Sequence, residues 1–447
     1  MNSIVLSTFS LLMFILPISG TIALRNVLVS ILILTLAVDF FKKRYFFNLF
    51  KPNKDLLVTS IALAAFLLYA LLHSIYLSHE PTWSLNNFRG HLLYPTIYFF
   101  TGILLANFVF KSKTISKKSL ITILFCSMFI HVLYMDLVAI DRLWSSGVIT
   151  RRYGGLIQYI TAANYMTNIL LAMIISELVY RLRVKKKIMI FPNGVLYLLL
   201  IFCIVSTFVE ALRLGDIALV FLGIGSATVF LYKNHEYSKS MRRVIATSLI
   251  VVLTIPLAYN INMDPRWSKL IETVPMAIDT SSSQHWLDRS LPRPKTENGH
   301  GVGGSNYERI AWAMKSLNFI IEDPIGIGYG KDAFGHALEK RYPQYTEKSY
   351  RGKNSHSAIL SLAVGIGIPG VLLWFMFIYT ISKKSIINFK ESYNYFAIMT
   401  LFVIIGFFGR SFVDANMRDH VFQQYMIILG IGLFFMIKEK NIEHTQE

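Results

Sequence analysis

Long apolar blocks separated by short polar turns recur along nearly the whole chain. A helix needs about 20 apolar residues to cross the hydrocarbon core of a bilayer, and twelve blocks approach or exceed that length. The predicted spans are residues 4–20, 26–41, 55–77, 91–110, 119–140, 160–180, 189–210, 214–232, 244–260, 357–380, 394–409 and 420–437. No basic stretch or small-residue cleavage site accompanies the first block, so we expect a retained helix rather than a signal peptide.

Composition supports an all-α polytopic membrane protein. Apolar residues make up 54% of the 447 residues, charged residues 16%, and the mean hydropathy is +0.50. Soluble proteins carry about 25% charged residues. The predicted organisation is helices 1–9 over residues 1–260, one large polar loop over residues 261–356, and helices 10–12 with a cytoplasmic tail over residues 357–447.

Positive charges fall on alternate loops and set the predicted orientation. Lysines and arginines gather at residues 42–54, 111–118, 181–187, 233–243, 383–390 and 438–440. Loops of this kind stay in the cytoplasm, so we expect both termini in the cytoplasm and residues 261–356 on the opposite, outer face of the membrane. This bias explains most of the net charge of +18. Because the cations form no single basic face, we expect no nucleic-acid partner.

The sequence offers no spacing typical of a metal or nucleotide site. Cys126 and Cys203 lie inside predicted spans, and no C-x-x-C, H-E-x-x-H or D-x-D motif occurs. The glycine run at residues 299–304 lacks the Lys-Ser/Thr of a phosphate-binding loop. We therefore expect no metal and no cofactor.

The outer turns carry arginine and no lysine. A guanidinium grips phosphate through a planar fork of donors, whereas an ammonium is a point charge. A single arginine is equally well explained by snorkelling to lipid headgroups or by capping a helix end, but the whole set favours a site for a diphosphate lipid. The set is Arg25, Arg89, Arg142, Arg151, Arg152, Arg213, Arg410 and Arg418.

The polar loop is predicted to hold one helix. Its first part, to residue 304, contains four prolines and is expected to be irregular. Ser305 and Glu308 match a capping box that would start a helix over residues 305–322. Its predicted apolar stripe is Ile310, Met314, Leu317 and Ile321.

Two candidate functional residues flank this helix and the next span. Arg309 lies in the first turns, where it either pairs with a nearby acid such as Glu308 or joins the helix N-terminus in holding an anion. His356 lies where the tenth span begins, with Asn354 or Ser355 as the expected N-cap. A helix dipole keeps a histidine in the first turn neutral, as a general base must be; the alternative is a structural histidine.

At these positions the sequence resembles the O-antigen ligase and polymerase superfamily. The resemblance is carried by Arg309–His336, Asn354–Ser357 and Gly365–Gly370, and Arg410–His420 is similar to the ligase branch in particular. It implies a GT-C-like fold in which His356 is catalytic and Arg213 and Arg309 bind the diphosphate of the donor. Around Arg213 the sequence Glu-Ala-Leu-Arg-Leu-Gly departs from the Ser/Thr-rich approach usual in the family.

The resemblance further implies a metal-independent, inverting glycosyltransferase of the bacterial inner membrane, with residues 261–356 and the active site on the periplasmic face. Its donor would be undecaprenyl-diphosphate-linked O-antigen, and its acceptor would be a sugar hydroxyl of lipid A–core. Both substrates would reach the protein within the membrane, surrounded by other membrane lipids. A diphosphate is already a good leaving group, so arginines that stabilise charge and a base that takes a proton suffice. Arg89, Arg410 and Asp414 are secondary candidates; Asp414 either orients His356 or, as we prefer, pairs with an arginine.

Three alternatives remain open from the sequence. An O-antigen polymerase or a protein O-oligosaccharyltransferase would use the same kind of donor. A lipid-linked glycan flippase would be expected to carry charges at mid-span. The predicted spans are nearly free of charge at their centres, and Asp136 is close to an end, which disfavours a flippase.

Overall fold

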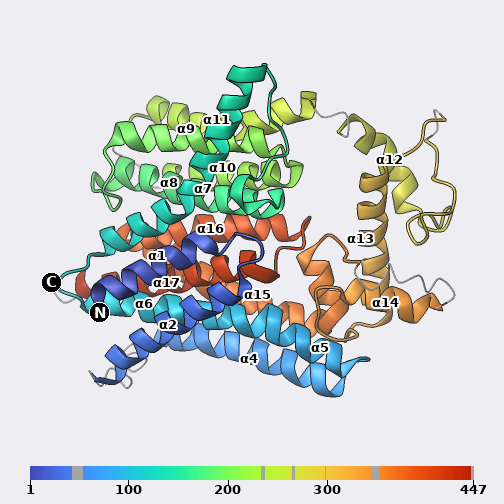
Figure 1. Ribbon diagram of the computed structural model, residues 1–447, viewed down its shortest axis with the longest axis horizontal. Helices are drawn as coiled ribbons and strands as arrows, with labels where there is room; N and C mark the ends of the chain where they lie inside the picture. Colours follow the sequence, from blue (N-terminus) through green and yellow to red (C-terminus); the bar gives the residue numbers. More distant parts are fainter. Residues whose placement is uncertain (43–53, 233–236, 264–266, 297–298, 344–352, 444–447) are drawn as a thin grey trace.

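The protein is helical throughout the part that the computed structural model describes, which is residues 1–42, 54–232, 237–263, 267–296, 299–343 and 353–443 (Figure 1). Within these ranges no strand forms, apart from an isolated bridge between Lys295 and Gly301. The prediction of an all-α polytopic protein is confirmed. The basic residues at positions 43, 44, 51 and 233, which contributed to the predicted orientation, lie outside the described residues.

Each of the twelve predicted spans corresponds to a helix. Among the described residues, nine helices are long and apolar enough to cross a membrane, and α1, α10 and α16 are shorter apolar helices. The twelve are α1 (Asn2–Ile15), α2 (Ile22–Lys42), α4 (Lys54–Tyr76), α6 (Tyr94–Lys111), α7 (Lys117–Ser146), α8 (Ile160–Val184), α9 (Asn193–Glu210), α10 (Arg213–Leu231), α11 (Lys239–Met263), α15 (Ala358–Ser392), α16 (Tyr395–Ser411) and α17 (Asp419–Glu443).

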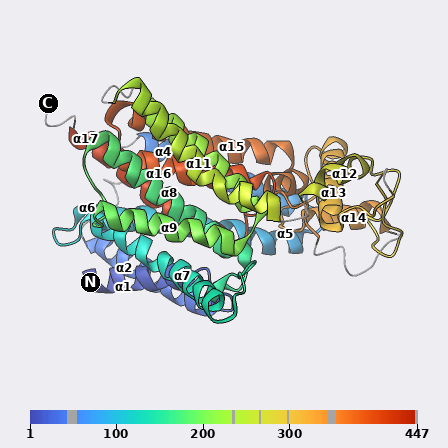
Figure 2. The same cartoon turned by 90° about the horizontal axis from the view of Figure 1, so that it is seen from above.

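The bundle is built around α8, α16 and α17. The apolar window of α8 is fully buried, whereas peripheral α11 exposes most of its window (Figure 2). Close packing of α6 on α17 depends on Gly102 and Gly430, because a Cβ at either glycine would overlap the backbone of the other helix. Small residues permit such close approach of membrane helices, where packing rather than a hydrophobic force holds them together.

The large loop contributes three helices at one end of the bundle. These are α12 (Ser268–Ile278), α13 (Gly304–Glu322) and α14 (Ala333–Arg341). They lie at the right of Figure 1, opposite the N-terminus and the end of α17. The termini and the loop therefore lie at opposite ends, as the predicted topology requires, and which end faces the periplasm stays a prediction.

Two expectations for the loop are wrong. Residues 268–278 form the helix α12 with Pro275 inside it, although this part was expected to be irregular. The capping box does not form: α13 begins after Gly303, without a side-chain cap. Glu308 instead accepts hydrogen bonds from Arg289 at 2.6 and 2.8 Å. The folded loop brings this guanidinium next to Glu308, so the carboxylate does not turn back to the backbone amide at the start of the helix.

The apolar stripe predicted for α13 is also wrong. Leu317 and Ile321 are 44% and 79% exposed. The buried face instead carries Tyr307, Trp312 and Phe319, which join an aromatic core with residues of the loop and α14. Helical spacing alone is compatible with burial of either face of α13. The face with the aromatic residues is buried because each of these side chains removes more apolar area from water.

The end of the loop docks on a break in α15. Ile366 and Gly367 leave helical geometry, and Gly367 has φ +68°. Ile327 and Gly328 donate backbone hydrogen bonds to the carbonyls of Val364 and Gly365 at 3.1 and 2.7 Å, and the Ile368 amide donates to the Pro324 carbonyl at 2.9 Å. This contact fixes the loop that carries the candidate site to the membrane bundle.

Candidate functional site

His356 is held by the aromatic face of α13. Its imidazole stacks on the Trp312 ring with centroids 5.4 Å apart and planes within 6°. Trp312 is buried, and its indole Nε1 donates to the Trp286 carbonyl at 2.9 Å. The backbone of His356 is left-handed, with φ +55°, and its amide donates to Asn354 Oδ1 at 3.0 Å. A stacked ring on a fixed backbone gives His356 a defined orientation.

The expected N-cap of α15 is wrong. Ser357 caps the helix by accepting a hydrogen bond from the Leu360 amide at 3.2 Å. His356 therefore precedes the cap and does not lie in the first turn. Asn354 satisfies the His356 amide instead of a helix amide, so the turn before the helix, rather than the helix itself, positions the imidazole.

The pKa of His356 is nevertheless lowered, to about 4. Burial is the largest cause, and the positive charge of Arg309 is the second. Asp414 and Glu308 act in the opposite direction and Arg418 in the same direction as Arg309. The main cause of this lowered pKa is burial beside a guanidinium, rather than the helix dipole expected from the sequence.

The structure brings Arg213 and Arg309 to the same helix. Arg213 is the first residue of α10, and its Nη1 donates to Asn306 Oδ1 of α13 at 2.9 Å. Asn306 and Arg309 are three residues apart and so lie on one face of α13. The Arg213 guanidinium also lies 5.7 Å from the centre of the Trp267 ring. One helix, α13, thus positions all three principal candidates: Arg213 through Asn306, Arg309 directly, and His356 through Trp312.

Asp414 pairs with Arg410, as preferred from the sequence. Arg410 is fully buried and donates to Asp414 Oδ2 from Nη2 at 2.9 Å and from Nε at 3.1 Å. The guanidinium also lies 3.7 Å from the centre of the Tyr165 ring. The Asp414 carbonyl accepts the Ala358 amide at 2.9 Å. The pair therefore supports the start of α15 next to His356, and it is enclosed by protein.

The same network contains a buried carboxylate that the sequence analysis did not single out. Glu210 accepts hydrogen bonds from Asn164 and from Thr167 Oγ1, the latter at 2.6 Å. Asn164 in turn accepts from Arg410 Nη1. Polar residues at 164 and 167, one helical turn apart in an apolar span, were the available signal. Glu210, where the chain departs from the Ser/Thr-rich family pattern, thus belongs to the network of Arg410.

The outer arginines do not form one site. Arg25 donates to Thr21 Oγ1 at 2.8 Å and to the Ile18 carbonyl, which closes the turn between α1 and α2. Arg142 lies over the Tyr153 ring at 5.0 Å, and Arg151 donates to Asn260 at 3.2 Å. None of these contacts involves Arg213 or Arg309, so the explanation of all eight arginines by one diphosphate site is wrong.

Arg89, the remaining secondary candidate, lies apart from the principal three. It is exposed at the start of the π-helical segment Arg89–Leu93, which follows α5 (Pro81–Phe88). Within the described part of the chain, Arg89 forms no hydrogen bond or ion pair with Arg213, Arg309 or His356.

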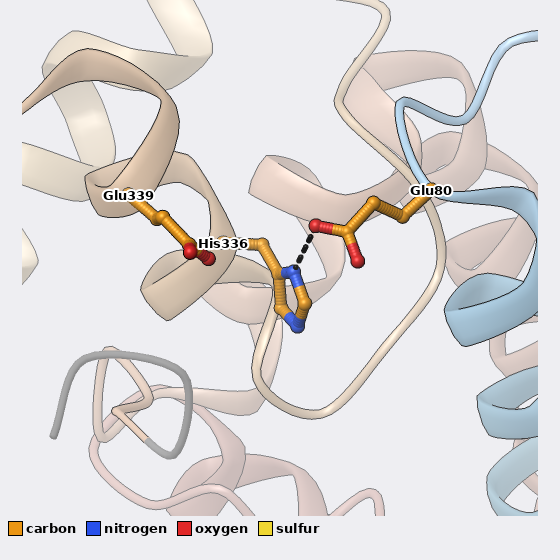
Figure 3. Close-up of side chains that lie close together, drawn as sticks. All are labelled: Glu80, His336 and Glu339. Carbon is orange, nitrogen blue, oxygen red and sulfur yellow. Dashed lines mark hydrogen bonds and ion pairs between the residues drawn. The ribbon is translucent and has the colours of Figure 1, made fainter. Parts of the chain in front are cut away.

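Donor atoms suited to a metal converge elsewhere, at the contact between α14 and the turn before α5 (Figure 3). His336 Nδ1 lies 3.1 Å from Glu80 Oε1, and one ligand atom from each of Glu80, His336 and Glu339 lies within 4.8 Å of the others. The His336 ring packs on Trp83 with centroids 3.8 Å apart. Beside this cluster, the ammonium group of Lys340 contacts His79 Nε2 and supplies a positive charge. The cluster ties α14 to the bundle and contains none of the three principal candidates.

Residues 195–375 match a family model described as O-antigen ligase. The matched region begins in α9 and ends in α15, and it contains Arg213, Arg309 and His356. None of the curated proteins compared with the chain matches it.

Proposed function

We propose that this chain, whose residues 195–375 match the O-antigen ligase family, is itself an O-antigen ligase. The reaction would transfer O-antigen polysaccharide from undecaprenyl diphosphate to a sugar hydroxyl of lipid A–core. The family supports an enzyme of the ligase and polymerase type. The observation that carries the proposal is that α13 gathers two guanidinium groups and a neutral, oriented imidazole at one end of a membrane bundle.

In the proposed mechanism the arginines hold the donor and His356 activates the acceptor. Arg213 and Arg309 bind the diphosphate, for which the paired donors of guanidinium are well suited. His356 takes the proton of the acceptor hydroxyl as its oxygen forms a bond to the anomeric carbon. The bond from that carbon to the diphosphate oxygen breaks, and undecaprenyl diphosphate leaves with the electron pair. Attack opposite the leaving group inverts the anomeric centre, and no step uses a metal.

A pKa of about 4 makes His356 neutral but a weak base in the protein without substrate. A bound diphosphate would change this, because its negative charge offsets Arg309 and favours the protonated imidazole. General bases work best when their pKa is near the working pH. We therefore expect donor binding to raise the pKa of His356 and so to prepare the base for the acceptor.

The proposal places this end of the bundle on the periplasmic face of the inner membrane, with both termini cytoplasmic. Both substrates are then lipids of the same leaflet, and they meet at the outer end of the helices. Arg410 and Asp414 are positioning residues in this scheme, because their pair supports the start of α15 and is buried away from any ligand.

A deletion strain tests the proposal directly. Loss of all O-antigen bands from lipopolysaccharide gels, with lipid-linked glycan accumulating, is the result expected for a ligase. A band of core plus one repeating unit would indicate a polymerase, and unchanged lipopolysaccharide with loss of a glycoprotein would indicate a protein O-oligosaccharyltransferase. A transfer assay with purified protein, run with chelator, separates an enzyme from a flippase and tests metal independence.

A further inference from the structure

A cavity with charged, polar and apolar lining lies close to the candidate site, and Arg418 contributes to its wall. Its volume is about 630 Å³, within the range of roughly 300–1,000 Å³ that is typical of small-molecule sites. Four segments line it: the turn between α1 and α2, the segment Arg89–Leu93, the start of α8, and residues 415–423, which lead into α17 and form its first turn. Arg213 and Arg309 do not line it, so it is separate from the diphosphate site proposed above.

The cavity carries the chemistry of a phosphate site. Arg25 and Arg418 supply two positive charges and Asp419 one negative charge, which leaves one net positive charge when the histidines are neutral. Arg25 is buried and anchored by Thr21, so its guanidinium is held in place. Tyr94 and Tyr165 add aromatic surface with hydroxyl groups. A guanidinium binds phosphate through paired, charge-assisted hydrogen bonds, and an aromatic wall with a few polar groups is typical of small-molecule sites.

The wall of the cavity is also the support of His356. Arg418 lines the cavity and is one of the charges that lower the pKa of His356. Tyr165 lines it as well, and its hydroxyl donates to Asp414 at 3.4 Å. The Asp414 carbonyl accepts the amide of Ala358, two residues after His356. The segment 414–418 therefore contributes both to the wall of this cavity and to the support of His356.

We infer that this cavity binds the phosphorylated sugar headgroup of the lipid acceptor, with Arg418 and Arg25 as its phosphate contacts. The inference rests on the proposed function. It explains why cations occur in two groups: Arg213 and Arg309 around α13 for the diphosphate of the donor, and Arg25 and Arg418 here for phosphates of the acceptor. Two separate anion sites would hold both lipids at once and leave only an acceptor hydroxyl to reach His356.

Binding to a transfer-inactive protein tests the inference without depending on turnover. Purified His356→Ala protein is titrated with lipid A–core, with enzymatically dephosphorylated lipid A–core, and with phosphatidylglycerol. Arg418→Gln removes one phosphate contact. Gly90→Trp fills the cavity, since a Cβ at Gly90 meets no atom within 4 Å. Arg142→Gln and Gly194→Trp are matched controls: Arg142 packs on Tyr153, and a Cβ at Gly194 likewise meets nothing within 4 Å.

We expect both cavity variants to weaken binding of lipid A–core by roughly tenfold or more, as loss of one charge-assisted contact predicts. Neither control should do so, and binding of the donor should not change. Dephosphorylated acceptor should bind weakly and show no further loss in Arg418→Gln. Full affinity of the cavity variants, or equal binding of phosphatidylglycerol, would overturn the cavity assignment alone. A His356→Ala protein that binds no lipid A–core would overturn the proposed function together with it.

Discussion

Replacing Arg309 with glutamine should raise the pKa of His356. The value of about 4 lies some 2.5 pH units below the ordinary 6.5. At about 1.4 kcal/mol per unit, this corresponds to about 3.5 kcal/mol of preference for the neutral imidazole. Burial is the larger cause and remains in the variant, whereas the second cause, the charge of Arg309, is removed. The pKa in Arg309→Gln should therefore lie above about 4 and below 6.5.

The pH dependence of kcat/KM measures this value, because it reports ionisations of the free enzyme. In the wild type, activity should fall on the acid side as His356 becomes protonated. In Arg309→Gln the rate should be lower overall, and the acid limb should move to higher pH. Lys315→Gln is the control: this residue is also on α13, but its ammonium lies over Trp286 at 5.1 Å and is not among the charges that act on His356.

An acid limb at the same pH in the wild type and Arg309→Gln would refute the electrostatic explanation. Folding stability gives a second measurement with a defined sign. Because the folded pKa is depressed, the unfolded chain binds the proton more tightly, and stability falls as pH drops from about 6.5 towards 4. That loss should be smaller in His356→Gln, since glutamine does not titrate.

Alkaline phosphatase fused after Lys295 should be active and after Lys187 inactive; the reverse would place the candidate site in the cytoplasm. Arg309→Lys should insert normally but lose about 2–4 kcal/mol of transition-state stabilisation, or roughly 30- to 1000-fold in transfer rate, because an ammonium cannot bind phosphate bidentately. Full activity would reduce Arg309 to a structural cation. His356→Gln should bind donor but transfer nothing, while His300→Ala stays active; an active His356→Gln would exclude the general base.

The spans and the rough places of the site residues follow from the sequence because membrane helices are specified by local composition. Twelve apolar blocks predict twelve helices, since in lipid each helix satisfies its own backbone. Arg309 and His356 could be singled out because each lies at the boundary of a predicted helix in a polar loop. The pairing of Asp414 with Arg410 was also predictable, because residues i and i+4 of a helix end meet.

The packing of the loop could not be predicted, because it depends on contacts between distant residues. The stacking of His356 on Trp312 and the bond from Arg213 to Asn306 join residues 44 and 93 positions apart, respectively. The capping box failed for the same reason, since Arg289 reaches Glu308 only in the folded loop. The spread of the outer arginines over separate helix ends likewise depends on partners that no local pattern identifies.

The break in α15 has a consequence for how the protein assembles. A helix interrupted at Ile366 and Gly367 leaves backbone groups that lipid cannot satisfy. Here Tyr69 of α4 donates to the Ile366 carbonyl at 3.1 Å, and residues 324–328 form three backbone hydrogen bonds with Val364, Gly365 and Ile368. The part of α15 before the break can therefore reach its final form only after α4 and the loop have met it. Insertions within residues 324–328 should block membrane integration or maturation, whereas insertions near residue 300 should be tolerated.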